Sequence, residues 1–228
     1  MVRMIVSPPP PFRPLSHDAY GELREAILAG RLPPGVRIVE AEIARQMAIS
    51  RGPIREAIRR LESDGLVEYQ PRRGTVVVRL SPDEVRDAYY LRAHLEAYAV
   101  RLAAVRATET DFATLEELID RMCASAGRDE FGELLSADVA FHAHICQLSG
   151  SKRLYRLWDS LNPHSWTLLT GLKASGYTLE QIAVRHRPIL AALQAGDADQ
   201  AEREIRLHII ELGNNVLEHL VGDPERPA

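Results

Sequence analysis

The stretch EAEIARQMAISRGPIREAIRRLESDGLVEYQPRRGTVVV, residues 40–78, decides the fold of the first third of the chain. Apolar residues recur at helical spacing in its first part, which predicts a short helix over residues 40–47, and again in its middle, which predicts a second helix over residues 51–64. Ser50 stands directly before the second helix as an N-cap, and Pro53 falls in its first turn, where the missing N–H has no helical partner. These residues predict two helices joined by a short turn.

The sequence on either side of these helices completes a small domain. LVEYQ and TVVVRL alternate β-branched and polar residues around the turn PRRG, which is typical of a two-stranded hairpin. Upstream, residues 17–29 place apolar side chains at helical spacing, and GRLPPG then stops that helix. Three short helices followed by a hairpin predict a winged helix-turn-helix over residues 17–80.

The second helix of the motif has one cationic face and one apolar face. Its basic stripe repeats every four residues and consists of Arg51, Arg55 and Arg59. The opposite face carries Ile54, Ala57, Ile58 and Leu61. A helix that enters the major groove needs this division, with forked donors turned to guanine edges and phosphates and apolar residues turned inward. An arginine helix alone is equally typical of a solvated basic face, so the order of the surrounding elements is what favours DNA.

The predicted hairpin adds a second cationic point at its tip, where Arg72 and Arg73 precede Gly74. A wing in this position meets phosphate or the minor groove. The distribution of charge along the chain also favours DNA binding by the N-terminal part. Residues 1–80 hold 13 arginines, no lysine and 9 acidic residues, whereas residues 81–228 hold 15 basic and 23 acidic residues. This asymmetry suits a DNA-binding unit joined to one that stays off DNA.

Composition excludes a disordered chain, because 46% of the residues are hydrophobic. The two cysteines, Cys123 and Cys146, fall within apolar periodic segments and are expected to be buried, reduced thiols. No apolar run has the length of a membrane span and the N-terminus lacks a signal peptide, so a cytoplasmic protein is expected. We expect a flexible, proline-rich lead-in over residues 1–16 and a disordered tail over residues 223–228.

The rest of the chain predicts an all-α antiparallel helical bundle over residues 81–222. Ser81 to Glu84 form a capping box with proline at the first helical position, so a domain boundary is expected near residue 80. Helices are expected at about 82–107, 110–126, 129–149, 151–173, 178–195 and 198–220. Pro163 and Pro188 should each kink or interrupt a helix. The fold class expected for the whole chain is mainly α.

Four residues of the predicted bundle have spacings that suit a metal site. Asp138 and His142 are four residues apart and so share one helix face. His186 and His208 lie equally far on either side of Asp197 in the predicted turn Gly196-Asp197, so in an antiparallel helix hairpin they reach about the same height and can face each other. One carboxylate and three imidazoles suit Zn²⁺, Ni²⁺ or Mn²⁺ and leave coordination positions open for an anionic ligand. His144 falls on another face and is expected outside this site.

The N-terminal motif resembles the winged-helix signature of the GntR regulators almost throughout. The resemblance implies that Arg51 and Arg55 read bases, that Ser50 contacts a phosphate and that Gly74 belongs to the wing tip. The C-terminal part of the chain resembles the FCD domain in the FadR-type branch of this family. The similar motifs are LRAHLEAYAVRLAA, DVAFHAHICQLSG and HRPILAALQAGDADQAEREIRLHI. In that domain an aspartate and three histidines bind a divalent metal, which implies the same role for the four residues above.

Two interpretations of Arg92 stay open. It can pair with Glu96 at i+4 as a solvated salt bridge. Alternatively, the resemblance implies that it reaches the cavity and binds a ligand carboxylate. His164 and Trp166 can likewise line the cavity or pack in the core.

The leading hypothesis is a homodimeric, effector-responsive repressor that binds a short palindromic operator in double-stranded DNA. The expected effector is a small carboxylate such as a hydroxy acid, a dicarboxylate or a sugar acid. One alternative is a metal sensor in which the ion is the signal. A metalloenzyme is a further alternative, but the sequence offers no clear general base beside the ligands and an enzyme would not explain the arginine helix, so no enzyme is expected.

Overall fold

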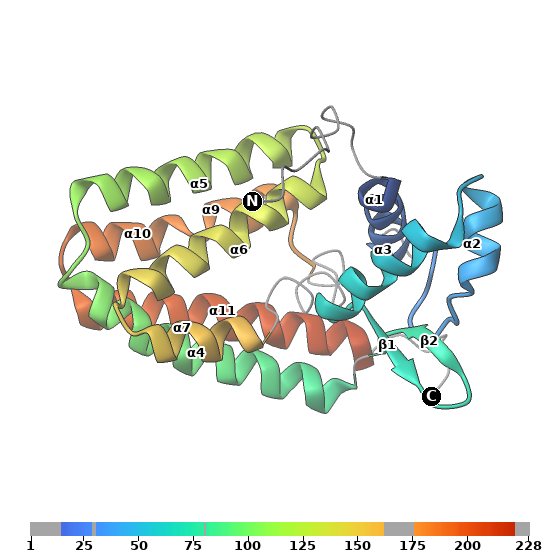
Figure 1. Cartoon of the computed structure of the whole chain (residues 1–228). Helices are drawn as coiled ribbons and strands as arrows, with labels where there is room; N and C mark the ends of the chain where they lie inside the picture. Colours follow the sequence, from blue (N-terminus) through green and yellow to red (C-terminus); the bar gives the residue numbers. More distant parts are fainter. Residues whose placement is uncertain (1–14, 29–30, 80, 162–175, 222–228) are drawn as a thin grey trace, which may run out of the picture. The chain divides into compact units, whose positions relative to one another are not determined.

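The computed structural model describes residues 15–28, 31–79, 81–161 and 176–221 (Figure 1). The chain divides into two compact units, Met1–Arg79 and Leu80–Ala228, called here the N-terminal and C-terminal units. The fold class is confirmed, because the described chain is mainly helical with one small antiparallel sheet in the N-terminal unit. No helix among these ranges is both long enough and apolar enough to cross a bilayer.

The N-terminal unit is a winged helix-turn-helix. Its elements in chain order are α1 (Leu15–Leu28), α2 (Glu40–Gln46), α3 (Arg51–Ser63), β1 (Val67–Gln70) and β2 (Gly74–Val77). The two strands pair antiparallel with Val67 opposite Val77 and Gln70 opposite Gly74. Helix α1 begins at Leu15, two residues earlier than expected. Ser16 in its first turn is buried, so this turn is part of the packed helix. The rest of the expected lead-in lies outside the described residues, as does the expected tail.

The core of this unit comes from the apolar face of α3. Its four predicted inward residues, Ile54, Ala57, Ile58 and Leu61, are all buried. Ala19 and Leu23 of α1, which packs against α3, are buried as well. The turn of the hairpin has left-handed backbone at Arg72 (φ 69°) and Gly74 (φ 83°). A Cβ at Gly74 would be strained by this φ, so glycine is the residue that suits the start of β2.

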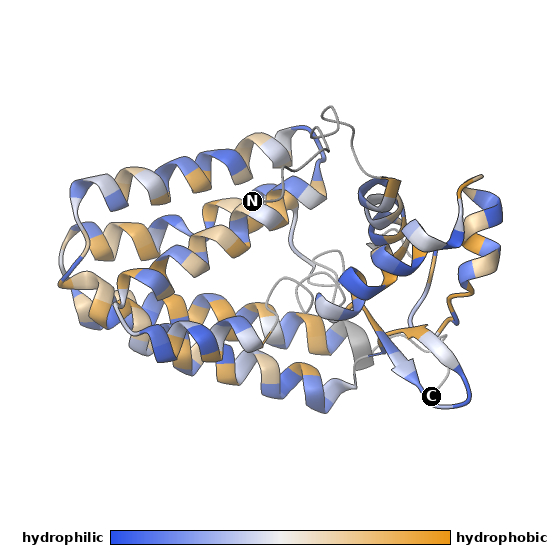
Figure 2. Cartoon of the chain, viewed as in Figure 1, coloured by the Kyte–Doolittle hydropathy of each residue, from blue (hydrophilic) through white to orange (hydrophobic). Residues whose placement is uncertain are grey.

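The described elements of the C-terminal unit are all helices. They are α4 (Pro82–Ala104), α5 (Glu109–Gly127), α6 (Phe131–Leu148), α7 (Lys152–Ser160), α9 (Leu179–Val184), α10 (Arg187–Gln194) and α11 (Ala198–Val221). The predicted capping box at Ser81 and Glu84 is present, and a second one joins Thr108 to Asp111. Hydrophobic and hydrophilic residues are interleaved along the long helices (Figure 2), as expected where each helix buries one face.

One expected helix is in fact two. The single helix predicted over residues 178–195 is interrupted between α9 and α10, at Arg185 and His186. Pro188 lies in the first turn of α10, as an interruption by this proline predicts. In a continuous helix the ring of Pro188 would crowd the carbonyl four residues earlier, and proline has no N–H to donate to it, so a break before Pro188 is favoured and α9 ends at Val184. Helix α7 is described to Ser160, and the remainder of the helix expected over residues 151–173, with Pro163, lies outside the described ranges.

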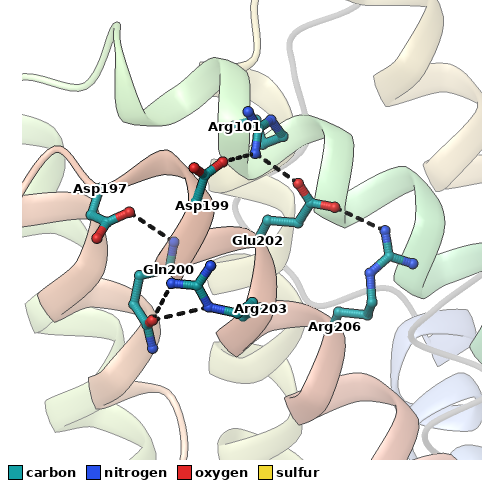
Figure 3. Close-up of polar contacts among 7 residues, drawn as sticks. All are labelled: Arg101, Asp197, Asp199, Gln200, Glu202, Arg203 and Arg206. Carbon is teal, nitrogen blue, oxygen red and sulfur yellow. Dashed lines mark hydrogen bonds and ion pairs between the residues drawn. The ribbon is translucent and has the colours of Figure 1, made fainter.

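Helices α4 and α11 pack closely along much of their length. A Cβ placed on Gly213 would lie 2.7 Å from Cγ of Tyr89, so glycine at this point allows the two helices to approach. Their surface contact carries an ion-pair network (Figure 3), in which Arg101 of α4 contacts Asp199 and Glu202 of α11 at 2.5 and 2.9 Å. Exposed pairs of this kind contribute little, so the buried packing is what fixes these helices.

Candidate metal centre and nucleic-acid interface

Four side chains from three parts of the C-terminal unit meet inside it, and we call them the Asp-His cluster. Asp138 and His142 come from α6, His186 from the break between α9 and α10, and His208 from α11. Each is buried and offers one ligand atom, and these atoms all lie within 4.8 Å of one another. A single cation can therefore reach all four groups, which are the ones that the sequence brings together by spacing.

The three imidazoles face one another closely. The ring centroids of His186 and His208 are 4.4 Å apart, and those of His142 and His208 are 5.2 Å apart. Nε2 of His186 lies 3.1 Å from a carboxylate oxygen of Asp138. His186 thus lies opposite His208 across the turn at Gly196 and Asp197, as the residue spacing predicts. The break before Pro188 does not disturb it, because His186 occupies the N-cap position of α10.

Hydrogen bonds on the outer ring nitrogens determine which nitrogen faces the cluster. Nδ1 of His142 donates to Glu96 Oε2 at 2.5 Å, and Nδ1 of His186 lies 3.2 Å from the backbone oxygens of Ile182 and Ala183. These acceptors require a proton on Nδ1, so the lone pair of each ring is on Nε2. Outer-ring bonds of this type orient the histidine ligands of metal sites.

Some inward nitrogens have no protein partner. Nε2 of His142 and Nδ1 of His208 are buried and form no hydrogen bond with any described residue. Buried polar atoms are normally paired, because a donor or acceptor that loses water without replacement costs free energy. A divalent ion among these nitrogens and the Asp138 carboxylate would satisfy them together, so the donor set fits the Zn²⁺, Ni²⁺ or Mn²⁺ expected from the sequence.

Glu96 of α4 links the Asp-His cluster to α4 and α7. Its carboxylate is fully buried and accepts hydrogen bonds from Nε of Arg92 at 2.6 Å, Nδ1 of His142 at 2.5 Å and Nε1 of Trp158 at 2.7 Å. The pair between Arg92 and Glu96 exists, but it is buried and not the solvated salt bridge that one of the two interpretations described: their side chains are 7% and 0% exposed. Both residues lie on the buried face of α4, which packs against α11 and α6.

Sequence reasoning missed Glu96 and Trp158 as parts of this site. A signal for Glu96 existed, since it shares the helical stripe of Ala93, Ala97 and Val100, all of which are buried. No spacing rule connects Trp158, on α7, with the other residues. Its indole N–H could be placed only from the packing of α7 on α4 and α6.

Burial and neighbouring charges set the ionisation of the site. Burial alone would raise the pKa of Glu96, but Arg92 and His142 lower it to about 2. Burial also opposes ionisation of Asp138, yet its close contact with His186 and the charge of Arg92 keep its pKa below the ordinary value. Burial lowers the pKa of His142 and, further, that of His208. Near neutral pH Asp138 is thus a carboxylate, and His142 and His208 are neutral imidazoles, which are the forms that bind metal.

Arg92 commits only one of its nitrogens to Glu96. None of the described residues accepts a hydrogen bond from its two Nη atoms, and its charge acts on Asp138 and His142. The salt bridge and a ligand-binding role are therefore compatible. His144 lies apart from the cluster, as expected, with Nε2 3.4 Å from Asp111 on α5. His164 and Trp166 fall outside the described ranges.

The predicted DNA-reading residues lie on one exposed face of α3 and on the hairpin. Arg51, Arg55 and Arg59 are exposed, while the apolar residues between them are buried. Ser50 takes the N-cap position of α3, but its side chain makes no capping hydrogen bond. The hydroxyl of Ser50 therefore has no capping role in α3.

At the wing, Arg72 is exposed, while Arg73 donates to the Gln70 side chain at 3.0 Å and lies beside the Gly35 carbonyl. Sequence reasoning missed a further cation: Arg37 is exposed, pairs through its backbone with Val76 of β2, and has its guanidinium beside Gly74. It also missed Glu40, whose carboxylate contacts both Arg51 and Arg55.

Comparisons with known proteins agree with both units. A family model described as bacterial regulatory proteins, gntR family, matches residues 15–77, and one described as FCD domain matches residues 87–211. A probable D-xylose utilization operon transcriptional repressor of Paenarthrobacter nicotinovorans is 33% identical over 189 residues, 80% of each chain. The HTH-type transcriptional repressor RspR of Escherichia coli K12 is 26% identical over 217 residues, 90% of each chain.

A GntR-type regulator of known structure from Rhodococcus sp. RHA1 matches with a TM-score of 0.68 at 23% identity, covering 89% of this chain and 97% of that one, which shows the shared fold. The winged helix and the helical unit define a DNA-binding regulator with a separate sensing domain. The chain belongs to the GntR family and carries an FCD effector-binding domain. The family consists of transcriptional regulators and not of enzymes, so the metalloenzyme alternative is set aside.

Proposed function

We propose that this regulator is a repressor whose operator binding is modulated by a small organic or sugar acid, bound at a divalent metal ion in the C-terminal unit. The observation that carries the proposal is the buried Asp-His cluster with a partly uncommitted arginine beside it. Repression is supported by the two relatives above, both of which are called repressors.

Asp138, His142, His186 and His208 would hold the metal, since their ligand atoms share one small space. The ion would supply a Lewis-acidic positive charge with coordination positions left over for an anion. Glu96 holds the ring of His142 in the ligating tautomer, and the backbone oxygens of Ile182 and Ala183 do the same for His186.

Arg92 would bind the acid. Its Nε is occupied by Glu96, which fixes the guanidinium, while its Nη atoms are available to a second carboxylate. An acid with one group for the metal and another for Arg92 fits this arrangement. The surroundings of the proposed ligand would be polar, because they include the four residues of the Asp-His cluster and the buried pair of Arg92 and Glu96. This favours a hydroxy acid, a dicarboxylate or a sugar acid over a long acyl chain.

Helix α3 would enter the major groove, with Arg51 and Arg55 at base edges. The phosphate-contacting set would consist of Ser50, Arg59, Arg72 and Arg73, with Gly74 shaping the wing tip. We place this activity in the cytoplasm, where the operator DNA of a bacterial regulator lies.

The proposed repressor is a homodimer on a palindromic operator. Support comes from an apolar stripe along α4 and its C-cap residue, where Leu91, Tyr98 and Val105 follow one another at seven-residue spacing and are 54%, 59% and 76% exposed. Large exposed apolar residues in a row on a helix are typical of an interface.

The proposal is tested by a thermal-shift screen of organic and sugar acids against zinc-loaded protein, repeated after chelation. We expect an acid to raise the melting temperature only when the metal is present, and to change operator affinity by about 1–3 kcal/mol. Arg92→Ala should lose the acid response and keep DNA binding, while Arg86→Ala, an exposed arginine of the same helix, serves as the control. An unchanged response in Arg92→Ala contradicts the role given to Arg92.

The Asp-His cluster also favours a second candidate, a metal sensor in which the ion itself is the signal. A chelator titration of operator binding separates the two. If metal removal alone produces the full change in operator affinity and no acid adds to it, the metal sensor is the correct function.

A further inference from the structure

An acidic side chain lies within the arginine stripe that is proposed to read DNA. Glu40 is the first residue of α2, on the other side of the turn from α3. Its carboxylate accepts two hydrogen bonds from Arg55, from Nε to Oε1 at 3.1 Å and from Nη2 to Oε2 at 3.0 Å. Nη2 of Arg51 lies 3.7 Å from the same Oε2. A carboxylate here is unexpected for affinity alone, since it repels the phosphates that the stripe would attract.

The geometry of the pair leaves the reading edge of Arg55 open. A guanidinium presents two forked edges, one formed by Nε and Nη2 and one formed by the two Nη atoms. Glu40 occupies the first edge. The second edge is the fork that matches O6 and N7 of guanine, and the Arg55 side chain is 56% exposed. Arg55 can therefore contact Glu40 and a guanine at the same time.

We propose that Glu40 is a positioning residue that holds the guanidinium of Arg55 in place for a guanine, so that it raises sequence specificity at the expense of general phosphate affinity. The proposal rests on the DNA-reading role given to α3. A long arginine side chain loses rotamer freedom when it docks on a base, and a forked partner within the protein removes that freedom beforehand. The negative charge of Glu40 repels the DNA phosphates and so disfavours binding through the phosphate backbone alone. This repulsion discriminates against non-cognate sequences.

The Glu40 carboxylate is ionised when this happens. The hydrogen bond from Arg55 lowers the pKa of Glu40 below its ordinary value, with further lowering by the charges of Arg55, Arg51 and Arg59. The pair is thus a charge-assisted fork throughout the neutral range.

The test compares Glu40→Gln with Glu42→Gln in the full chain. Glu42 is an exposed acid in the same first turn of α2, so its variant removes an equal charge from the helix terminus without touching Arg55. Two duplexes serve as probes: the tightest one recovered from a random-sequence selection, and a scrambled duplex of equal composition. Fluorescence anisotropy gives both affinities over a range of salt concentrations.

We expect Glu40→Gln to bind the selected duplex about tenfold more weakly and the scrambled duplex more tightly, with a steeper salt dependence. Substituting each guanine of the selected duplex in turn should show relaxed preference at one position. A purely structural role would weaken both affinities together. The proposal is overturned if Glu40→Gln matches Glu42→Gln on both duplexes, or if both affinities shift in the same direction.

Arg55→Ala distinguishes failure of this proposal from failure of the proposed function. Loss of affinity for the selected duplex in Arg55→Ala, combined with no effect of Glu40→Gln, overturns the positioning role alone. Wild-type affinity in Arg55→Ala overturns the reading role of α3, and the role of Glu40 with it.

Discussion

Replacing Glu96 by glutamine is the sharpest perturbation of the C-terminal unit, because it removes one charge and almost no volume. The variant leaves the Arg92 guanidinium buried beside an amide, where the Glu96 carboxylate accepted three hydrogen bonds. Loss of one partner of a buried ion pair is strongly destabilising, since the remaining charge is neither solvated nor paired.

The size of the effect follows from the pKa. A carboxyl group whose pKa falls from 4.5 to about 2 on folding contributes about 3 kcal/mol to the free energy of unfolding at neutral pH. Breaking a buried pair costs a similar amount, about 3–5 kcal/mol. Because the folded-state pKa of Glu96 is the lower one, this contribution is present above the unfolded pKa and is lost as the pH falls from about 4.5 toward 2.

The assay is urea unfolding of the chelator-treated protein at pH 7, followed by circular dichroism, so that metal loss does not contribute. Glu117→Gln is the matched control, because Glu117 is an exposed glutamate of α5. We expect Glu96→Gln to lose about 3 kcal/mol relative to this control, and to bind zinc about 10–100-fold more weakly through the misoriented His142. A difference from the control within about 0.5 kcal/mol would refute the account of the buried pair.

Three other predictions concern separate parts of the chain. Arg72→Ala, at the exposed wing tip, should weaken binding to all duplexes alike and reduce the salt dependence by about one phosphate contact; a loss confined to one sequence would contradict this. Burial and the hydrogen bond to Asp64 raise the pKa of Tyr20 to about 12, so Tyr20→Phe should lose about 1 kcal/mol below pH 10 in urea unfolding, and this difference should shrink as the pH rises toward 12. Tyr98→Glu should place a charge in the apolar stripe of α4 and yield monomers in light scattering, whereas an unaltered dimer would exclude this stripe as the interface.

The sequence was sufficient for those parts of the fold whose signals are local. Helical spacing separated the exposed arginines of α3 from Ile54 and Leu61, and the alternation around PRRG located the wing. The Asp-His cluster was predictable in part for the same reason. Asp138 and His142 share a helix face, and the turn at Gly196 relates His186 to His208 by simple counting.

The remaining features depend on tertiary packing. Whether Arg92 and Glu96 are solvated is decided by the helices that cover α4, and periodicity alone left this open. The hydrogen bond from Trp158 comes from a helix 62 residues away in sequence, and Glu40 meets Arg55 across 15 residues. Such contacts follow from the placement of elements and have no spacing rule.

The central claim is that the Asp-His cluster is a metal site, and elemental analysis tests it most directly. Protein is incubated with Zn²⁺, Ni²⁺ and Mn²⁺ in turn, desalted and measured by mass spectrometry of the metals, alongside His142→Ala, His208→Ala and the control His144→Ala. We predict about one ion per chain in the wild type and in His144→Ala, and reduced occupancy in the other two variants. Absence of bound metal under all three conditions, or loss of metal only in His144→Ala, would contradict the account.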